Sequence, residues 1–353
     1  MAGYEDRLYH PGEPPDFKRS APRMRVSVII PTYNRAALLP RTLAAILAQT
    51  CPAAEIIVVD DGSTDATAEM LAGFPAPVRA LRIANSGDLA ARNAGLAVAN
   101  GDLVAFCDSD DLWRPEFLAE MLALWERAPE LHAAYSDFVI VQGEAWGTET
   151  KFAAAPPSFW NGLRALGPGQ AVFDRPVIDR LIHFQPLFAS CIVARRDWFA
   201  AIGGWDNGVA RVLSGDFATA LRLGAHPPLG IVQKPLVGIR WHQGNISADT
   251  MRVTLGEAEV LEHVLATHPA AAPYAAEIRA SIALRRRQAL GGAFVAGQHE
   301  LVRRIYPCLP PSQRSLAVRL KHAVSGLPGP FRMALTTALL AGGTARARLR
   351  DGG

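Results

Sequence analysis

Four apolar runs alternate with helical patterns through the first 130 residues of this 353-residue chain. The runs are RVSVII (25–30), EIIVVD (55–60), VRALRI (78–83) and LVAFC (103–107). Continuous apolar runs rich in β-branched residues are typical of strands buried on both faces of a sheet. Strands that alternate with helices form βαβ units, so the chain is predicted to be an α/β protein with a mostly parallel central sheet flanked by helices. We expect Pro31 to end the first strand.

The rest of the chain is less regular. The runs AAYSDFVIV (133–141) and FASCIVA (188–194) predict strands of a second, mixed part of the sheet. The last 100 residues are mostly helical in pattern and are interrupted by prolines. The first 24 residues are rich in charge and proline, which is typical of a flexible arm.

Bulk properties restrict the location and the partners. Four widely spaced cysteines without a C-x-x-C pair favour a reducing compartment and argue against a zinc site or a disulfide framework. Neither a signal peptide nor a transmembrane run is recognisable, so we expect a cytoplasmic protein, either soluble or peripheral to a membrane. After residue 300 there are nine Lys or Arg against one acid. This basic tail suggests an anionic partner such as a membrane surface, although solvated helix faces explain it equally well.

An acid cluster, CDSDD, directly follows the fourth apolar run and contains Asp108, Asp110 and Asp111. Strands of open α/β sheets deliver the residues at their carboxyl ends to the edge where ligands bind. Because crowded carboxylates repel one another, we expect a cation among them, and Mg²⁺ prefers such oxygen ligands. The alternative is a solvated turn that opens the next helix, with Asp111 near its cap.

Two further polar segments end at the same edge of the predicted sheet, PTYNR (31–35) and DDGSTD (60–65). Tyr33 offers a face on which a base can stack, and Asp60 and Asp61 offer acceptors for the imide and ribose groups of a nucleotide. Arg92 can reach a phosphate from its helix. Neither G-x-G-x-x-G nor the P-loop motif is present, so metal and Arg, not a glycine cradle, are expected to hold the phosphates.

These motifs carry a family resemblance. VSVIIPTYNR, IIVVDDGSTD, ARNAGLAVANGDLVAFCDSDDLW and the later GGWD, SGDF and RLG resemble an inverting family 2 glycosyltransferase with the GT-A fold, over residues 24–250. The resemblance implies transfer of a sugar from a nucleotide-sugar donor, in the first place a UDP-sugar, with Mg²⁺ or Mn²⁺ as cofactor. The acceptor would be a hydroxyl of a glycan or lipid-linked saccharide in polysaccharide biosynthesis at the cytoplasmic membrane face. No nucleic-acid partner is expected.

The resemblance also implies three regions and a set of site residues. A GT-A domain at 25–250 would have a nucleotide-binding half at 25–130 and an acceptor half at 131–250, followed by a helical basic extension at 251–353. The donor site would contain Pro31, Thr32, Tyr33 and Arg35, with Asp60 or Asp61 beside the nucleoside, Arg92 and Asn93 at the diphosphate or sugar, and Asp108 at the ribose. Asp110 and His242 would ligate the metal, and Asp216 would be the catalytic base. Ser247, in the same segment as His242, is a weaker candidate for a contact with the metal or the diphosphate.

One position departs from the family pattern, because Gly215 stands where the family usually has Glu before the catalytic Asp. This departure puts acceptor selectivity or support of the loop in doubt. Structural alternatives remain for several residues: Asp216 as a helix cap, His242 as a hydrogen-bonded loop histidine, Asp61 as a turn acid, and Trp205 and Trp241 as core residues instead of an acceptor platform. For the whole chain, the alternatives are a catalytically inactive GT-A binding module and a sugar nucleotidyltransferase.

Overall fold

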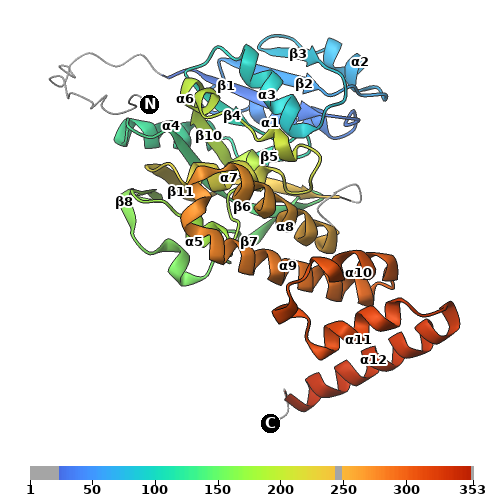
Figure 1. Ribbon diagram of the computed structural model, residues 1–353. Helices are drawn as coiled ribbons and strands as arrows, with labels where there is room; N and C mark the ends of the chain where they lie inside the picture. The colour runs from blue at the N-terminus through green and yellow to red at the C-terminus, as the bar shows by residue number, and fades with distance from the viewer. Residues whose placement is uncertain (1–23, 243–248, 351–353) are drawn as a thin grey trace, which may run out of the picture.

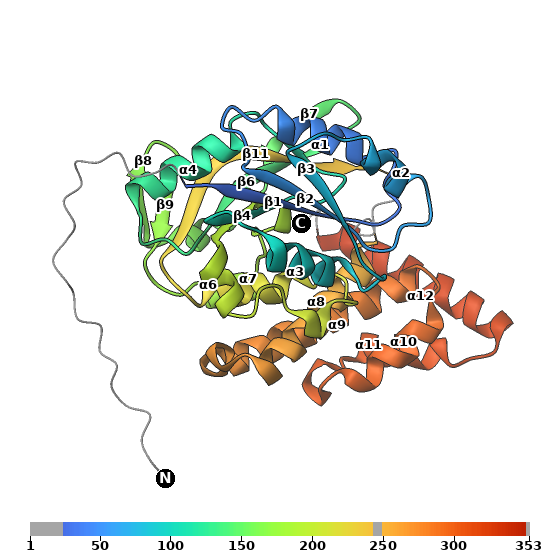
Figure 2. The ribbon, with the colours of Figure 1, turned by 90° about the horizontal axis from the view of Figure 1, so that it is seen from above.

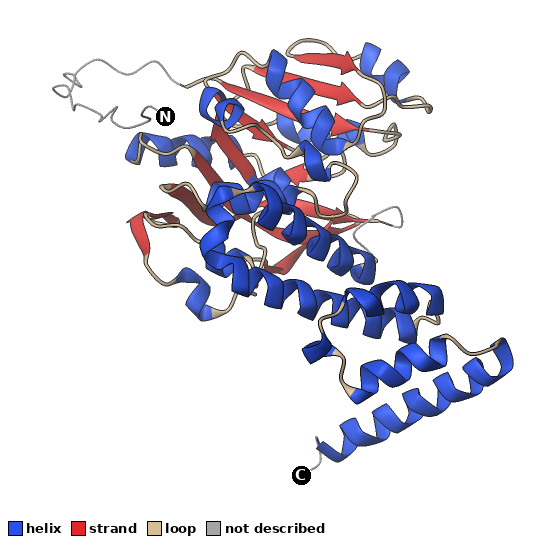
Figure 3. Cartoon of the chain, viewed as in Figure 1, coloured by secondary structure: helices blue, strands red, loops and turns tan. Residues whose placement is uncertain are grey.

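The computed structural model describes residues 24–242 and 249–350. Ser247 and all but the last residue of the predicted N-terminal arm therefore lie outside the described residues. The described chain forms one mixed sheet of eleven strands with helices on both faces, followed by a set of C-terminal helices (Figures 1 and 3). The predicted α/β class, the central sheet and the helical C-terminal region are confirmed.

The first half of the sheet is parallel, as predicted. Its strands lie in the order β3 (Val78–Arg82), β2 (Glu55–Asp60), β1 (Val26–Thr32) and β4 (Leu103–Phe106). The connecting helices are α1 (Leu39–Leu47), α2 (Thr67–Ala72) and α3 (Asp88–Val98). In the centre of this half, Ile29 lies between Ile57 and Phe106, and all three side chains are buried.

The prediction that Pro31 ends the first strand is wrong. Pro31 pairs with Val59 inside β1, whereas the pairing of β1 with β4 ends at Ile29 and Phe106. The backbone oxygen of Ile29 accepts a hydrogen bond from the Cys107 backbone N–H, which directly follows β4. The backbone nitrogen of Pro31, two residues further along β1, faces the same side of the strand. Because β4 has ended there, the missing N–H of proline costs no ladder hydrogen bond.

The second half of the sheet is mixed, which confirms the prediction. β10 (Ile192–Arg195) runs antiparallel between β4 and β6 (Ala133–Gln142), and β11 (Leu229–Trp241) runs parallel to β6. The sheet continues through β9 (Gln170–Phe173) and β8 (Leu163–Gly167), while β5 (Leu112–Trp113) pairs with β11 and β7 (Ala145–Thr150) pairs with β6. In the run FASCIVA only the last three residues are in a strand, because 189–191 form a 3₁₀ turn.

Helices cover both faces of the sheet. Figure 2 shows α1 and α4 (Phe117–Arg127) on one face, and α3, α6 (Arg196–Ala201), α7 (Asp216–Gly224) and α8 (Thr250–Thr267) on the other. A short helix, α5 (Ile178–Leu181), precedes β10. This arrangement places α3 and α7, which come from the two halves of the chain, on the same side of the sheet (Figure 2).

The C-terminal helices continue with α9 (Ala275–Val295), α10 (His299–Ile305), α11 (Leu316–Ser325) and α12 (Gly329–Arg350), and α10–α12 project away from the sheet (Figure 1). Leu261 and Ile278 belong to the same hydrophobic core as the sheet, whereas Leu290 and Phe294 belong to a second, smaller core. The two cores therefore meet within α9, and the boundary predicted at residue 250 stays a prediction. None of the described helices combines the length and apolar character needed to span a bilayer.

Candidate active site

Asparagine 34 joins the two loops that follow β1 and β2. Its side-chain oxygen accepts a 2.7 Å hydrogen bond from the Thr64 backbone N–H, and its own N–H donates to the Ser63 hydroxyl at 2.9 Å. Asn34 has a φ of 53°, in the left-handed region that Asn tolerates better than most residues. The predicted meeting of PTYNR and DDGSTD is thus built from local turn chemistry at Asn34, a residue that the sequence analysis did not single out.

The predicted nucleoside residues lie together at this edge, with different exposure. Pro31, Thr32, Asp60 and Asp61 are buried, whereas Tyr33 is 45% exposed. The Asp60 carboxylate accepts a bond from the Ser63 N–H at 2.8 Å and pairs with Arg82 at 3.1 Å. The Asp61 carboxylate accepts bonds from the N–H groups of Ser86 and Gly87 at 2.7 and 2.9 Å. Asp61 therefore fixes the start of α3, a structural role that leaves Tyr33 as the exposed surface.

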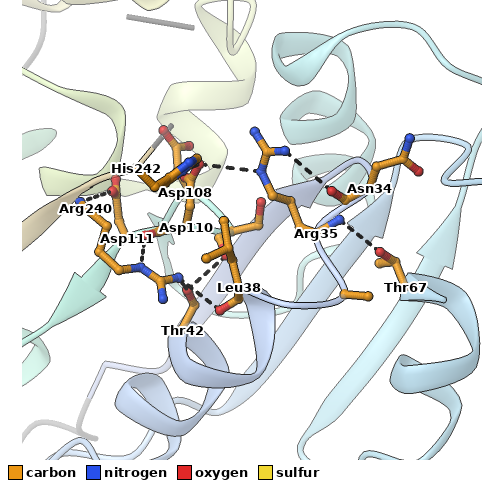
Figure 4. A network of polar contacts seen from close by, with 12 residues as sticks. Asn34, Arg35, Leu38, Thr42, Thr67, Asp108, Asp110, Asp111, Arg240 and His242 are labelled. Carbon is orange, nitrogen blue, oxygen red and sulfur yellow. Dashed lines mark hydrogen bonds and ion pairs between the residues drawn. The ribbon is translucent and has the colours of Figure 1, made fainter. Parts of the chain in front are cut away.

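The three carboxylates of the acid cluster point in different directions (Figure 4). Asp111 is buried, accepts a 2.5 Å bond from the Ser190 hydroxyl, and is followed directly by β5. Burial, together with the charges of Asp108 and Asp110, raises the pKa of the Asp111 carboxyl well above its usual value. The alternative of a solvated turn with Asp111 near the cap of the next helix is wrong for this residue, because Asp111 is buried and α4 begins only at Phe117.

The Asp110 side chain is partly exposed and lies close to two cationic or basic side chains. Its Oδ2 lies 3.1 Å from Nε2 of His242 and 3.5 Å from Nε of Arg35 (Figure 4). His242 directly follows β11, so the fold brings together residues more than 130 positions apart. Arg35, Asp110 and His242, which were all predicted site residues, are thus neighbours.

Arg92 forms the second centre of charge. Its buried guanidinium pairs with Asp88 at 2.5 Å and with Asp108, and it lies over the Trp205 ring at 5.0 Å. Burial alone would lower the pKa of Arg92, but the charges of Asp108 and Asp88 raise it above its ordinary value. Burial raises the pKa of the Asp108 carboxyl, against the attraction of Arg92. The carboxyl of Asp88, which the sequence did not single out, thus belongs to the site.

Asn93, next to Arg92, binds a backbone segment of the second half of the chain. Its amide donates to the Trp205 oxygen and accepts from the Trp205 N–H, both at 2.8 Å. Trp205 is buried against Phe106, so the core alternative for this tryptophan is confirmed. Trp241, by contrast, is 46% exposed. A contact of Asn93 with the donor stays a prediction.

Asp216 is the first residue of α7 and is half-buried. Burial raises the pKa of its carboxyl to about 7, with Asp108 and Asp88 adding to the rise and Arg92 opposing it. The charges of Arg92 and Asp108 therefore act on the Asp216 carboxyl. The N-cap residue of α7 is Gly215, so Asp216 lies one position inside the helix, where the Phe217 backbone N–H interacts with its carboxyl. The base role and the helix-cap alternative both stay predictions.

Gly215 packs against a carbonyl group and a helix. A Cβ atom at this position would lie 2.7 Å from the Val209 oxygen and 3.0 Å from a methyl group of Leu89 on α3. The turn before α7 is therefore closed against α3 in a way that a larger residue would obstruct. The glycine that departs from the family pattern is consistent with the local packing of this loop.

The acid cluster fits a divalent cation. The side chains of Asp108 and Asp110 are 37% and 20% exposed, whereas Asp111 is only 4% exposed and satisfied internally. Carboxylate oxygens with one imidazole, from His242, are suitable ligands for Mn²⁺ or Mg²⁺, which also bind phosphate oxygens and water. The donor set therefore favours Asp110 with His242, and Asp108 beside them.

Arg240, a residue of β11, contacts the acid cluster and was not predicted as a site residue from the sequence. Its buried guanidinium donates to the backbone carbonyl oxygens of Asp110 and, at 2.9 Å, Leu38, and to the Thr42 hydroxyl at 2.8 Å (Figure 4). Its N–H donates to Asp111 at 3.2 Å. Arg240 thus ties β11 and α1 to the acid cluster.

Replacing Arg240 by methionine should lower the free energy of unfolding by about 2–4 kcal/mol, because the buried backbone oxygens of Asp110 and Leu38 and the Thr42 hydroxyl would lose the guanidinium that donates to them. Urea denaturation followed by tryptophan fluorescence measures this change. Arg164→Met removes an exposed ion pair with Asp174 and serves as the control, with an expected cost of at most about 1 kcal/mol. Equal costs for both variants would contradict the supporting role of Arg240.

The chain is similar in sequence to known glycosyltransferases. Residues 27–185 match the model of the family Glycosyl transferase family 2. An uncharacterised glycosyltransferase of Nostoc is 40% identical over 107 residues, which are 29% of this chain and 33% of that protein. A validoxylamine A glucosyltransferase of Streptomyces hygroscopicus subsp. jinggangensis is 29% identical over 63% of this chain and 58% of its own length. The chain thus spans only a third to somewhat over half of these two relatives.

Two solved structures share the fold. S. aureus TarS 1–349 in complex with UDP-GlcNAc has a TM-score of 0.56 and 16% identity, over 88% of this chain and 90% of that one. The mannosyltransferase PcManGT from Pyrobaculum calidifontis in complex with GDP-Man and Mn²⁺ has a TM-score of 0.51 and 20% identity, over 92% and 87%. Both likenesses show that the described fold is that of GT-A glycosyltransferases.

Proposed function

We propose that this chain, whose residues 27–185 match the model of Glycosyl transferase family 2, transfers a sugar from a nucleotide-sugar donor to a hydroxyl group with inversion of the anomeric carbon. A UDP-sugar is the first donor to test. One observation carries this proposal: Asp110 lies 3.1 Å from His242 and 3.5 Å from Arg35, and the charges of Arg92 and Asp108 act on the Asp216 carboxyl. These contacts support a cation site at Asp110 and a base at Asp216.

The chemistry requires these two functions. The sugar leaves through a transition state with oxocarbenium character, while negative charge gathers on the diphosphate. Asp110 and His242 would hold Mg²⁺ or Mn²⁺, whose Lewis acidity stabilises the leaving diphosphate so that no protein general acid is required. Asp216 accepts the proton of the acceptor hydroxyl, and its pKa of about 7 suits a base at neutral pH. A single base with in-line attack gives inversion.

Incubating the full chain with a panel of nucleotide sugars and Mn²⁺ tests the function. The ligands that raise the melting temperature identify the donor, because a ligand that binds only the folded state stabilises it. We expect release of nucleoside diphosphate when an acceptor or water takes the sugar. Release of pyrophosphate would instead favour a nucleotidyltransferase. Donor binding without any turnover would favour an inactive binding module.

Tyr33 is expected to stack on the base of the donor. Replacing it by alanine should weaken nucleoside diphosphate binding by about tenfold, because stacking on an aromatic ring typically contributes about 1–3 kcal/mol per base. Tyr33→Phe keeps the ring and should bind as the wild type does, which isothermal titration calorimetry can measure. If the alanine variant binds UDP and GDP with unchanged affinity, the base lies elsewhere.

We further propose that the acceptor is a glycan or lipid-linked saccharide reached at the cytoplasmic face of a membrane. The C-terminal helices support this proposal, because Leu316, Phe331 and Met333 are 68–74% exposed and basic residues such as Arg319 lie beside them in the sequence. Exposed apolar side chains with neighbouring cations are typical of helices that bind anionic membrane surfaces.

Vesicle sedimentation tests the membrane contact. The chain should sediment with vesicles that contain phosphatidylglycerol, less so at 0.5 M salt, and not with pure phosphatidylcholine vesicles, since electrostatic attraction is screened by salt. Replacing Leu316 and Phe331 by serine should weaken sedimentation several-fold, whereas the exposed Val295→Ser on α9 should have little effect. Equal sedimentation with both lipids would contradict the basic surface as the cause.

A further inference from the structure

A cluster of two imidazoles and one carboxylate lies outside the proposed sugar-transfer site. Asp206 ends the GGWD segment, His263 lies on α8, and His268 directly follows α8. Oδ2 of Asp206 is 3.1 Å from Nε2 of His263 and 2.8 Å from Nε2 of His268. One atom from each of the three side chains lies within 4.8 Å of the others, and all three residues are partly buried. Segments about 60 positions apart thus converge on one oxygen.

The surrounding backbone fixes this convergence. The other carboxylate oxygen, Oδ1, accepts a 3.0 Å bond from the Gly208 N–H, and the Asp206 N–H donates to the Thr219 hydroxyl at 3.1 Å. Oδ2 is therefore left to the two rings. A Cβ atom at position 208 would lie 2.3 Å from Cε1 of His263, so a glycine is required for this imidazole to approach. The two rings approach at 76° to each other, with centroids 6.1 Å apart.

We propose that Asp206, His263 and His268 bind a divalent cation of the zinc class, with water completing the coordination. Two imidazole nitrogens and one carboxylate oxygen are a donor set that Zn²⁺ accepts, and ligand atoms about 2.0–2.2 Å from a tetrahedral zinc lie about 3.3 Å apart. The observed separations between Asp206 Oδ2 and the two ring nitrogens, 3.1 and 2.8 Å, are close to this spacing, and the two ring nitrogens lie within 4.8 Å of each other. The widely spaced cysteines argue against thiolate zinc sites, and they do not bear on this set of ligands.

The position of the cluster indicates what the cation would do. Asp206 follows Trp205, whose backbone is held on both sides by Asn93 of α3 and whose ring lies under Arg92. A cation at Asp206 would link α8 to the segment that packs against α3. It would thus hold the C-terminal helices to the half of the domain that carries Arg92. This role is structural and does not depend on the proposed transferase activity.

The competing description is a set of hydrogen bonds in which both imidazoles donate from Nε2 to Asp206. Exchange of His263 for glutamine separates the two descriptions, because glutamine retains an N–H donor but is a poor zinc ligand. His268→Gln gives an independent second variant. The exposed His226, which bonds to the Arg222 oxygen, provides the matched control His226→Gln.

The experiment uses the full chain without a histidine tag, freed of metal by a chelator and then titrated with Zn²⁺ and, separately, Co²⁺ in the absence of nucleotide. We expect one equivalent of bound Zn²⁺ by elemental analysis, a rise in melting temperature of about 3 °C or more, and Co²⁺ absorption bands of a nitrogen- and oxygen-ligated ion. His263→Gln and His268→Gln should each weaken Zn²⁺ binding at least tenfold, while His226→Gln and Asp110→Ala should not.

Two results would overturn the proposal. If the wild type binds no Zn²⁺, or binds it as well as both glutamine variants do, the cluster is a hydrogen-bonded one only. If Zn²⁺ binding is lost in Asp110→Ala and kept in the glutamine variants, the ion is at the acid cluster. Because no sugar donor is present in this experiment, either result leaves the proposed transferase activity untouched.

Discussion

Replacing Asp216 by asparagine should reduce turnover by about 10²–10⁴-fold, the usual contribution of a positioned general base. Asparagine has nearly the same shape but cannot accept the proton of the acceptor hydroxyl. Donor affinity should change less than about threefold, because the donor residues proposed from Tyr33 to Asp110 remain in place. Initial rates of nucleoside diphosphate release and calorimetric titration with donor measure the two effects.

The raised pKa of Asp216 adds a dependence on pH. A base with a pKa of about 7 must lose its proton to act, so kcat/KM of the wild type should fall tenfold per pH unit below about 7. Stability should show the opposite dependence. The folded protein holds a proton that an unfolded carboxyl, with its ordinary value of 3.8, releases, so this contribution to stability is lost as pH rises from about 4 to 7. Asp216→Asn should therefore be at least as stable as the wild type at pH 8.

That stability measurement also serves as a folding control for the inactive variant. A second control is Asp197→Asn, which changes a carboxylate that is 88% exposed and paired with the neighbouring Arg196. It should retain full turnover. Near-normal turnover of Asp216→Asn would show that another group takes the proton.

Replacing Asp110 by alanine should lower metal-dependent turnover at least about 100-fold, because the Lewis acid effect on a leaving diphosphate is worth several kcal/mol. Affinity for the donor in the presence of Mn²⁺ should fall as well, since the cation bridges protein and phosphates. His242→Ala should have the same kind of effect at smaller size, because an imidazole supplies one ligand beside carboxylate, phosphate and water.

Titration of activity with Mn²⁺ distinguishes a metal ligand from a residue that merely supports the site. The Mn²⁺ concentration for half-maximal rate should rise more than tenfold in Asp110→Ala, whereas Asp197→Ala should leave it unchanged. A reduced rate with an unchanged Mn²⁺ requirement would show that Asp110 acts by ordering Arg35 and His242, its neighbours at 3.5 and 3.1 Å.

The sequence predicted the first half of the fold well, since strands buried on both faces leave continuous apolar runs such as 55–60 and 103–106. It predicted poorly where tertiary context overrides local preference. Pro31 stays within β1 because the neighbouring strand has already ended. Asp111 is followed by β5, which pairs with β11 from far along the chain, and no local pattern contains that partner.

In the candidate site, too, some residues could be proposed from the sequence and others only from the structure. Motifs and the family resemblance proposed Tyr33, Asp108, Asp110, Asp216 and His242 by residue type and order, because the chemistry of a diphosphate and a hydroxyl requires carboxylates and an aromatic face; their roles stay predictions. Motifs did not locate Asn34, Asp88 or Arg240, whose contacts hold the site together, since single polar residues carry no spacing pattern.

By itself, the sequence determined the α/β class, the edge of the sheet that carries the site and the residue types available there, because strand periodicity and loop chemistry are local properties. Only the tertiary structure decided that Asp108 and Asp110 stay partly exposed whereas Asp111 is buried, and that the charge of Arg92 acts on Asp216. It also decided that Asp206, His263 and His268 meet at one point. Such convergence depends on how α3, α7, α8 and β11 pack across the sheet, and packing between distant segments leaves no trace in the order of residues.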